Sequence, residues 1–184
     1  MKYERAAKGF RVKRNRKNMY EIFDPLGRSF GDYFTQHEAI TRTYKLKRMA
    51  CTTTISDGGR RESGIIEHND CAVRAVSFML NQPYPVVHDA FKKLGRKSKH
   101  GTPHYITQEY LAHYGVKPIK RENIDIRFIG QLPEHFPVGK LLVHVKGHLV
   151  TMIDGVFQDM FWTKYYEVIL DLYCYESDRE KFKL

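Results

Sequence analysis

The sequence contains few of the residues that build covalent or metal-linked scaffolds. Its 184 residues include three cysteines, Cys51, Cys71 and Cys174, with no Cys-x-x-Cys spacing. An odd and sparse set of cysteines in a non-secreted chain argues against a disulfide framework. A metal site would have to be assembled from scattered residues, so we expect neither a metal nor another cofactor.

Long apolar runs are also missing. No stretch approaches the roughly 18 to 20 apolar residues that a membrane-spanning helix needs, and the first residues, Met-Lys-Tyr-Glu-Arg, include no apolar core of a secretory signal. We therefore expect a cytoplasmic protein with no membrane partner. Hydrophobic residues still make up 42% of the chain and aromatic residues 13%, which excludes a wholly disordered protein.

Acidic residues are scarce in one part of the chain. Residues 1–61 hold 15 of the 31 Lys and Arg but only 6 of the 21 Asp and Glu, whereas residues 62–184 are nearly balanced. A local basic block indicates an acidic partner, either nucleic acid or an acidic protein face. The alternative is a charged surface that only keeps the protein dissolved.

Patterning divides the chain into a small β-rich unit and a larger mixed one. Residues 9–49 predict three short strands, with a turn at 24–27, and a helix that begins at the capping box Thr35-x-x-Glu38 and runs to about Met49. Polar, glycine-containing residues then predict a linker. We therefore expect a basic β-β-β-α unit at 1–51, a linker at 52–64 and a second domain at 65–184.

The second domain reads as α+β, with helices first and strands after them. Helices are expected over 70–80, 83–94 and 105–114, and strands over 140–145, 148–153, 156–161 and 165–173. The dipeptide Asp154-Gly155 is a strong hairpin signal between two of these strands. This order predicts helices packed on an antiparallel sheet.

Cys71 and His148 occupy the positions that a thiol hydrolase requires. Cys71 follows Asn69-Asp70, two good N-cap residues, so it should lie in the first turn of a helix, where partial positive charge favours the thiolate. His148 begins a strand and can act as general base and acid. A hairpin closed at Asp154-Gly155 places His148 and Asp159 on one face within side-chain reach, so Asp159 can orient the imidazole.

A thiol hydrolase also needs hydrogen-bond donors for the oxyanion that forms during the reaction. The Cys71 backbone N–H and the Asn69 side chain are the candidate oxyanion donors.

Cys51 and Cys174 are interpreted as small buried residues, and Trp162 is expected in the core rather than along a substrate cleft.

Several motifs resemble those of a family of small bacteriophage proteins. They are the box Asn69-Asp70-Cys71-Ala72-Val73-Arg74-Ala75, the segment Gly95-Arg96-Lys97 and the hairpin His148-Leu149-Val150-Thr151-Met152-Ile153-Asp154-Gly155. These motifs in turn resemble papain-like cysteine peptidases, although the Gln that such enzymes carry shortly before the cysteine is absent here. The box is also similar to that of ovarian-tumour-type deubiquitinases, but His68 stands where they have Asp, which argues against that type.

The resemblance implies a papain-like cysteine-hydrolase fold behind the basic unit. It implies a phage-encoded thiol hydrolase, a peptidase, isopeptidase or amidase, that acts on a protein or peptide in the host cytoplasm through Cys71, His148 and Asp159. The alternative hypothesis is a nucleic-acid-binding or host-modulating accessory protein, which contacts nucleic acid through residues 1–61 and whose papain-like domain is catalytically silent.

Overall fold

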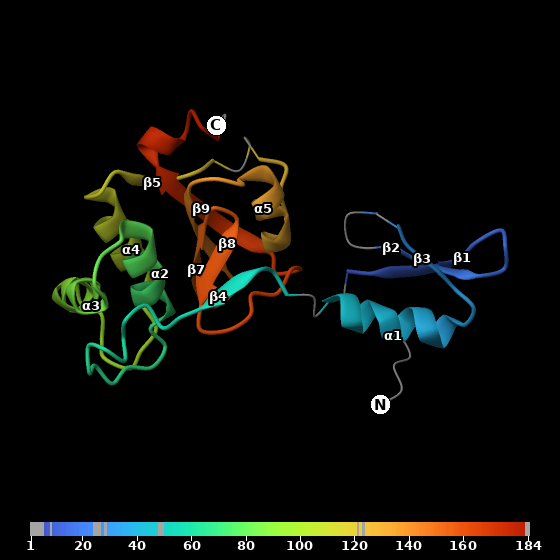
Figure 1. The fold of residues 1–184 in the computed structure, drawn as a ribbon, viewed down its shortest axis with the longest axis horizontal. Coiled ribbons are helices and arrows are strands. Elements are labelled where there is room, and N and C mark those ends of the chain that lie inside the picture. Colours follow the sequence, from blue (N-terminus) through green and yellow to red (C-terminus); the bar gives the residue numbers. More distant parts are fainter. Residues whose placement is uncertain are drawn as a thin grey trace. The chain divides into compact units, whose positions relative to one another are not determined.

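The computed structural model describes residues 6–7, 9–23, 27, 29–47, 50–120, 122 and 124–182. The chain divides into two compact units, Met1–Met49 and Ala50–Leu184 (Figure 1). Among the described residues, five α-helices and nine strands in two sheets make a mixed α+β architecture.

The first unit is a three-stranded antiparallel sheet with one helix. Its elements are β1 (Arg11–Arg14), β2 (Tyr20–Phe23), β3 (Ser29–Tyr33) and α1 (Gln36–Lys47). The capping box predicted at the start of α1 is confirmed, because the Glu38 N–H donates to Thr35 Oγ1 at 3.2 Å and the Thr35 N–H donates to Glu38 Oε2 at 3.1 Å. Residues 24–26 of the expected turn and residues 48–49 of the expected helix lie outside the described residues.

The second unit is built on a six-stranded sheet in the order β4-β8-β7-β6-β9-β5. The strands are β4 (Thr53–Ile55), β5 (Val116–Pro118), β6 (Lys140–Val145), β7 (His148–Ile153), β8 (Val156–Asp159) and β9 (Ile169–Tyr175). All neighbours pair antiparallel except β4 and β8, which are parallel.

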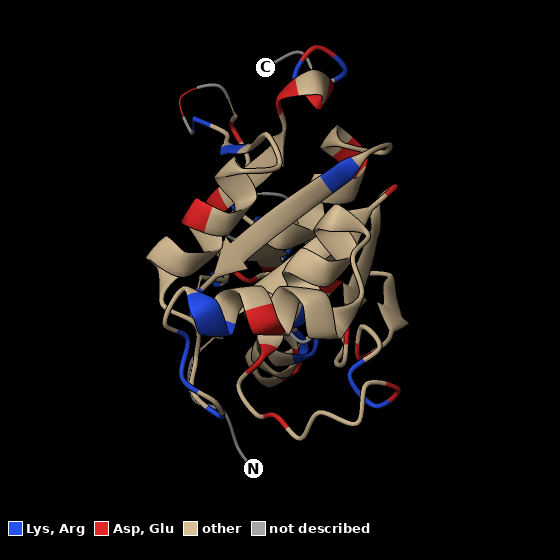
Figure 2. Ribbon diagram, turned by 90° about the vertical axis from the view of Figure 1, so that its left-hand side faces the viewer, with Lys and Arg blue, Asp and Glu red and all other residues tan. Residues whose placement is uncertain are grey.

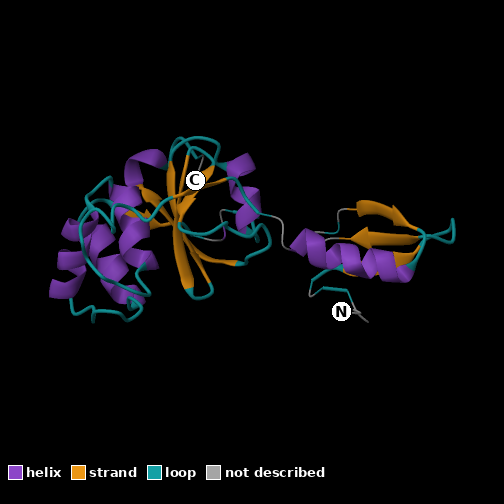
Figure 3. Ribbon diagram, turned by 60° about the horizontal axis from the view of Figure 1, so that its bottom comes forward, coloured by secondary structure: helices purple, strands orange, loops and turns teal. Residues whose placement is uncertain are grey.

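Helices cover both faces of this sheet. Figure 3 shows α2 (Cys71–Leu80), α3 (Tyr84–Lys93) and α4 (His104–Ala112) together on one side and α5 (Leu132–His135) on the other. Each side has its own apolar cluster, one around Val76, Phe91 and Leu142 and one around Leu132 and Leu141. Burial on both faces explains why β6 and β7 read as nearly continuous apolar runs.

Residues 52–64 do not form the linker that their polar composition predicts. Thr53–Ile55 form β4 at the edge of the sheet, and the Ser56 N–H donates to the Asp159 carbonyl at 2.8 Å. The boundary between the two units falls between Met49 and Ala50. A strand of three residues contains too little apolar sequence to stand out from a loop, so the pattern did not reveal it.

The last expected strand is displaced along the chain. A strand was predicted at 165–173, whereas β9 spans Ile169–Tyr175. Tyr165 and Tyr166 lie in a turn and pack edge to face with their ring centroids 4.8 Å apart. Their aromatic character, which favours a strand in sequence, is used here for loop packing.

The second unit carries charge of both signs. Figure 2 shows Lys and Arg interspersed with Asp and Glu on the face that carries α3. Among the residues that the structure describes, every helix is too short or too polar to cross a lipid bilayer.

Candidate functional site

Cys71 is the first residue of α2, where a loop enters the helix. Asn69 adopts a left-handed φ of 52°, which asparagine tolerates better than most residues, and Asp70 occupies the N-cap position. The Thr151 hydroxyl donates to the Ala75 carbonyl at 2.6 Å and fixes α2 against β7. The N–H groups of the first helical turn point out of this end, so the sulfur lies in a region of partial positive charge.

His148 and Asp159 come together through the hairpin of β7 and β8. Asp154 and Gly155 have φ values of 48° and 76°, the left-handed pair that a tight two-residue hairpin turn requires. Ile153 pairs with Val156 in this hairpin, as the sequence predicts. The result is a bond of 2.6 Å between His148 Nε2 and Asp159 Oδ2.

The imidazole of His148 and the Cys71 thiol lie on the wall of the same cavity. Burial alone would raise the pKa of Cys71, but the hydrogen bond and positive charge of His148 hold it below its ordinary value of 9.0. Because Nε2 faces Asp159, Nδ1 is the nitrogen left for the sulfur. The Leu149 N–H adds a bond to the sulfur and Arg74 adds positive charge, so the thiolate is favoured.

The pKa of His148 moves in the complementary direction. Burial alone would lower it, but hydrogen bonds to Asp159 and Cys71, together with their charges, raise it from 6.5 to about 10. An acidified thiol next to a basic imidazole favours a thiolate–imidazolium pair.

The other two cysteines show the opposite behaviour. Both are free and buried, and burial raises the pKa of Cys51 to about 12 and that of Cys174 to about 11. Cys71 is therefore the one cysteine of the three that is set up as a nucleophile.

Asp159 is held by a buried charge network that the sequence did not reveal. Arg74 is 6% exposed; its Nη1 pairs with Asp70 Oδ1, and its Nη2 lies 3.7 Å from Asp159 Oδ1. Asp70 also accepts the Tyr84 hydroxyl at 2.8 Å and Arg60 Nη1 at 3.3 Å. Asp70, expected as a helix cap, makes no side-chain cap bond; it pairs instead with Arg74, which joins the start of α2 to the carboxylate behind His148.

A second buried pair fixes the loop that leads to Cys71. Glu67 is 3% exposed, and Arg96 donates to both of its carboxylate oxygens at 3.2 and 3.3 Å. The Lys99 N–H donates to the same carboxylate at 2.7 Å, and His88 lies 3.2 Å away. Although burial would raise the pKa of Glu67, these bonds hold it far below its ordinary value of 4.5.

A cavity of about 430 Å³ opens beside the sulfur. Asn69 lies on its wall, and its side-chain amide donates to the Lys99 carbonyl at 3.3 Å. Phe161 lines the same cavity and is 68% exposed, and the neighbouring Trp162 is 62% exposed. The expectation that Trp162 packs in the core is wrong, because β8 ends at Asp159 and the chain then leaves the sheet.

Comparisons with protein-family models, with curated proteins and with solved structures gave no match to this chain.

Proposed function

We propose that this protein is a papain-like thiol hydrolase that cleaves an amide bond in a protein or peptide through Cys71, His148 and Asp159. The observation that carries this proposal is the convergence of Cys71, His148 and Asp159 from α2 and the β7–β8 hairpin. His148 Nε2 bonds Asp159 Oδ2 at 2.6 Å, and the Cys71 thiol at the N-terminus of α2 lines the same cavity as His148 and has its pKa lowered by it. The resemblance to small bacteriophage proteins adds a host cytoplasm as the proposed location.

The three residues divide the steps of the reaction between them. The Cys71 thiolate attacks the amide carbonyl, and the tetrahedral intermediate collapses when the C–N bond breaks and the His148 imidazolium gives its proton to the leaving amine. His148 then removes a proton from water, which attacks the thioester and releases the carboxylic acid and the Cys71 sulfur. Asp159 keeps the imidazole oriented throughout.

The oxyanion of the intermediate needs donors that are fixed in advance. The Cys71 N–H belongs to the first turn of α2 and points out of the helix end. Asn69 is proposed as the second donor: its side chain has two N–H groups, of which one bonds the Lys99 carbonyl and the other is available.

The surroundings of the cavity favour a large substrate. Phe161 and Trp162 are exposed aromatic side chains next to the catalytic strand β8. Exposed apolar side chains beside an open cavity are typical of a surface that receives a protein or peptide.

The first test is the rate at which iodoacetamide alkylates each cysteine as a function of pH, measured by peptide mass spectrometry on the full chain. We expect Cys71 to react with an apparent pKa well below the free-thiol value of about 8.5, while Cys51 and Cys174 remain slow. His148→Ala should shift the profile of Cys71 to higher pH. A Cys71 that titrates as an ordinary thiol, or is unaffected by His148→Ala, would refute the activated pair.

The second test is acyl transfer itself. With p-nitrophenyl acetate as a general acyl donor, Cys71 should become acetylated, and the acetyl group should then be lost to water. Cys71→Ser should abolish both steps, and His148→Ala should slow them. An acetyl-Cys71 that forms but does not turn over would identify a reactive but non-hydrolytic thiol and overturn the hydrolase.

Nucleic-acid binding by the basic unit is the second candidate function. The observation that favours it is the run of exposed cations on β1 and the turn after it, which are Arg11, Lys13, Arg14, Arg16 and Lys17. Binding of duplex DNA or RNA by the full chain should weaken steeply with salt and persist in Cys71→Ser. Binding that is insensitive to salt would exclude this candidate.

A further inference from the structure

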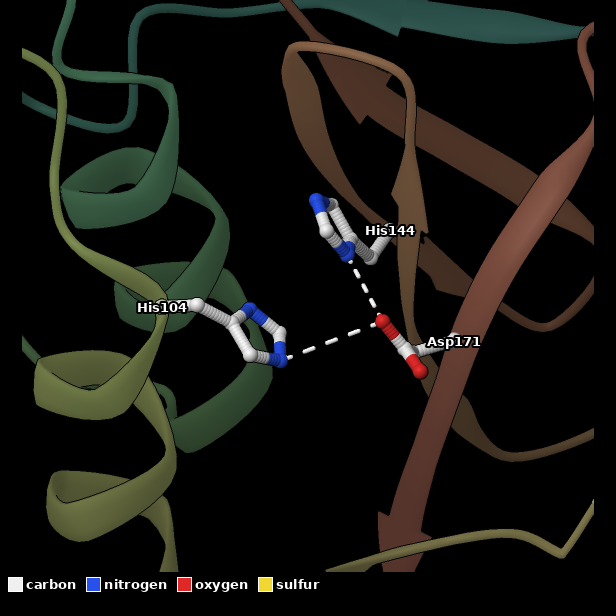
Figure 4. A group of neighbouring side chains, drawn as sticks. All are labelled: His104, His144 and Asp171. Carbon is white, nitrogen blue, oxygen red and sulfur yellow. Dashed lines mark hydrogen bonds and ion pairs between the residues drawn. The ribbon is translucent and has the colours of Figure 1, made fainter.

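A second cluster of side chains lies near the catalytic pair but takes no part in it. His144 on β6 and Asp171 on β9 are direct cross-strand partners, and His104 is the first residue of α4. Figure 4 shows that both imidazoles direct a nitrogen at the Asp171 carboxylate. His144 Nδ1 lies 2.8 Å from Asp171 Oδ2, and His104 Nε2 lies 3.8 Å from the same oxygen.

The spacing of these atoms is close to that of a metal site. One ligand atom from each side chain lies within 4.8 Å of the other two. Tetrahedral zinc, with ligand bonds of about 2.0 to 2.2 Å, separates its ligand atoms by about 3.3 to 3.6 Å. The 2.8 and 3.8 Å separations from the carboxylate oxygen fall on either side of that range, so a small shift suffices there, whereas the two imidazoles have to reorient to share one ion.

The side chains have room to make that change. The imidazoles stack with centroids 4.8 Å apart, and an ion must lie in the plane of each ring that binds it, so both rings have to turn. The side chains of His104 and His144 are 38% and 25% exposed, which permits rotation. The Tyr173 hydroxyl lies 2.8 Å from His104 Nε2. On metal binding it would lose its hydrogen bond to that nitrogen and keep the one that it accepts from Gln108.

We propose that His104, His144 and Asp171 bind a divalent transition-metal ion of the zinc class. Two imidazoles and one carboxylate are the donors that such ions prefer, and three protein ligands leave at least one position open. His104 and His144 also line a cavity of about 230 Å³ that reaches Cys71. The open position therefore borders the space next to the thiol, and the site does not depend on hydrolysis by Cys71.

The experiment is a zinc titration of the full chain against a chromophoric chelator. A thiolate–imidazole pair also binds zinc, so Cys71→Ser is the essential comparison. We expect one zinc per chain that survives Cys71→Ser. His144→Ala removes a direct ligand and should weaken zinc affinity at least about 100-fold, because even changes to groups behind the ligands lower metal affinity by about 10 to 100-fold.

Two further variants complete the design. Asp171→Asn keeps the shape of the side chain and should weaken zinc binding without unfolding the protein, and His113→Ala, which changes an exposed histidine elsewhere, should leave it unchanged. Zinc that disappears with Cys71→Ser and persists in Asp171→Asn would assign the ion to the thiol instead. Zinc binding no tighter in the parent than in Asp171→Asn would show that the cluster is only a hydrogen-bonded surface group.

Discussion

Replacing Asp159 with asparagine tests the electrostatic basis of the proposed nucleophile. Asp159 lies 2.6 Å from His148 Nε2, its side chain is 7% exposed and that of His148 is 30% exposed, so solvent screens the pair only in part. An opposite charge at this distance raises the pKa of an imidazole by about 1 to 3, or about 1.4 to 4 kcal/mol. The pKa of His148, now about 10, should therefore fall to about 7 to 9 in Asp159→Asn.

The lowered His148 pKa has a consequence for the thiol. The imidazolium stabilises the thiolate, and in Asp159→Asn it loses its proton at a lower pH, so the pKa of Cys71 should rise toward the ordinary value of 9.0. At pH values well below the pKa of a thiol, each unit by which that pKa rises reduces the thiolate fraction about tenfold. We therefore expect the alkylation profile of Cys71 to move to higher pH in Asp159→Asn, with a rate loss of about tenfold for each unit of that move at pH values below it, which peptide mass spectrometry across the pH range measures directly.

The chain offers a matched control for this experiment. Asp171 also bonds an imidazole, that of His144, at 2.8 Å, but it belongs to the other cluster. Asp171→Asn in zinc-free buffer should leave the Cys71 profile unchanged. Superimposable profiles for the parent and Asp159→Asn, or an equal shift in Asp171→Asn, would refute the assignment of Asp159 as the residue that orients and charges His148.

Three other expectations follow from the same contacts. The reactive ion pair requires His148 to keep its proton, so hydrolysis should fall as the pH rises through about 10, which a pH–rate profile checks; a plateau well beyond that pH would contradict it. Glu67→Gln leaves the buried Arg96 without its anion and should cost about 3 to 5 kcal/mol of unfolding free energy in urea. Because the pKa of Glu67 is lowered in the folded state, its stabilisation is present above 4.5 and lost as the pH falls, so Glu67→Gln should lack that part of the acid sensitivity. A Cβ at Gly130 would lie 2.1 Å from the Tyr165 ring, so Gly130→Ala should destabilise by about 1 to 3 kcal/mol or more, whereas Gly101→Ala, with open space around it, should not.

The positions of Cys71 and His148 could be predicted because local rules determine each of them. Asn69 and Asp70 mark a helix start, which α2 confirms at Cys71. The turn at Asp154 sets the register of its hairpin, and that register alone predicts which carboxylate can reach His148. The same rules could not reveal what holds that carboxylate, since Arg74 and Asp159 meet only when α2 packs on the sheet.

The cluster of His104, His144 and Asp171 shows where local rules stop. Sequence did contain a hint, because His100 and His104, like His144 and His148, are separated by the three residues that often space two metal ligands. One histidine from each pair enters the cluster, so neither spacing identifies it. The third ligand depends on β9 pairing with β6, and the strand expected at 165–173 begins four residues too early to supply that register. A site made by two strands and a helix far apart in the chain can be recognised only in the folded structure. Zinc titration of Asp171→Asn tests whether the three side chains that meet there bind a metal ion.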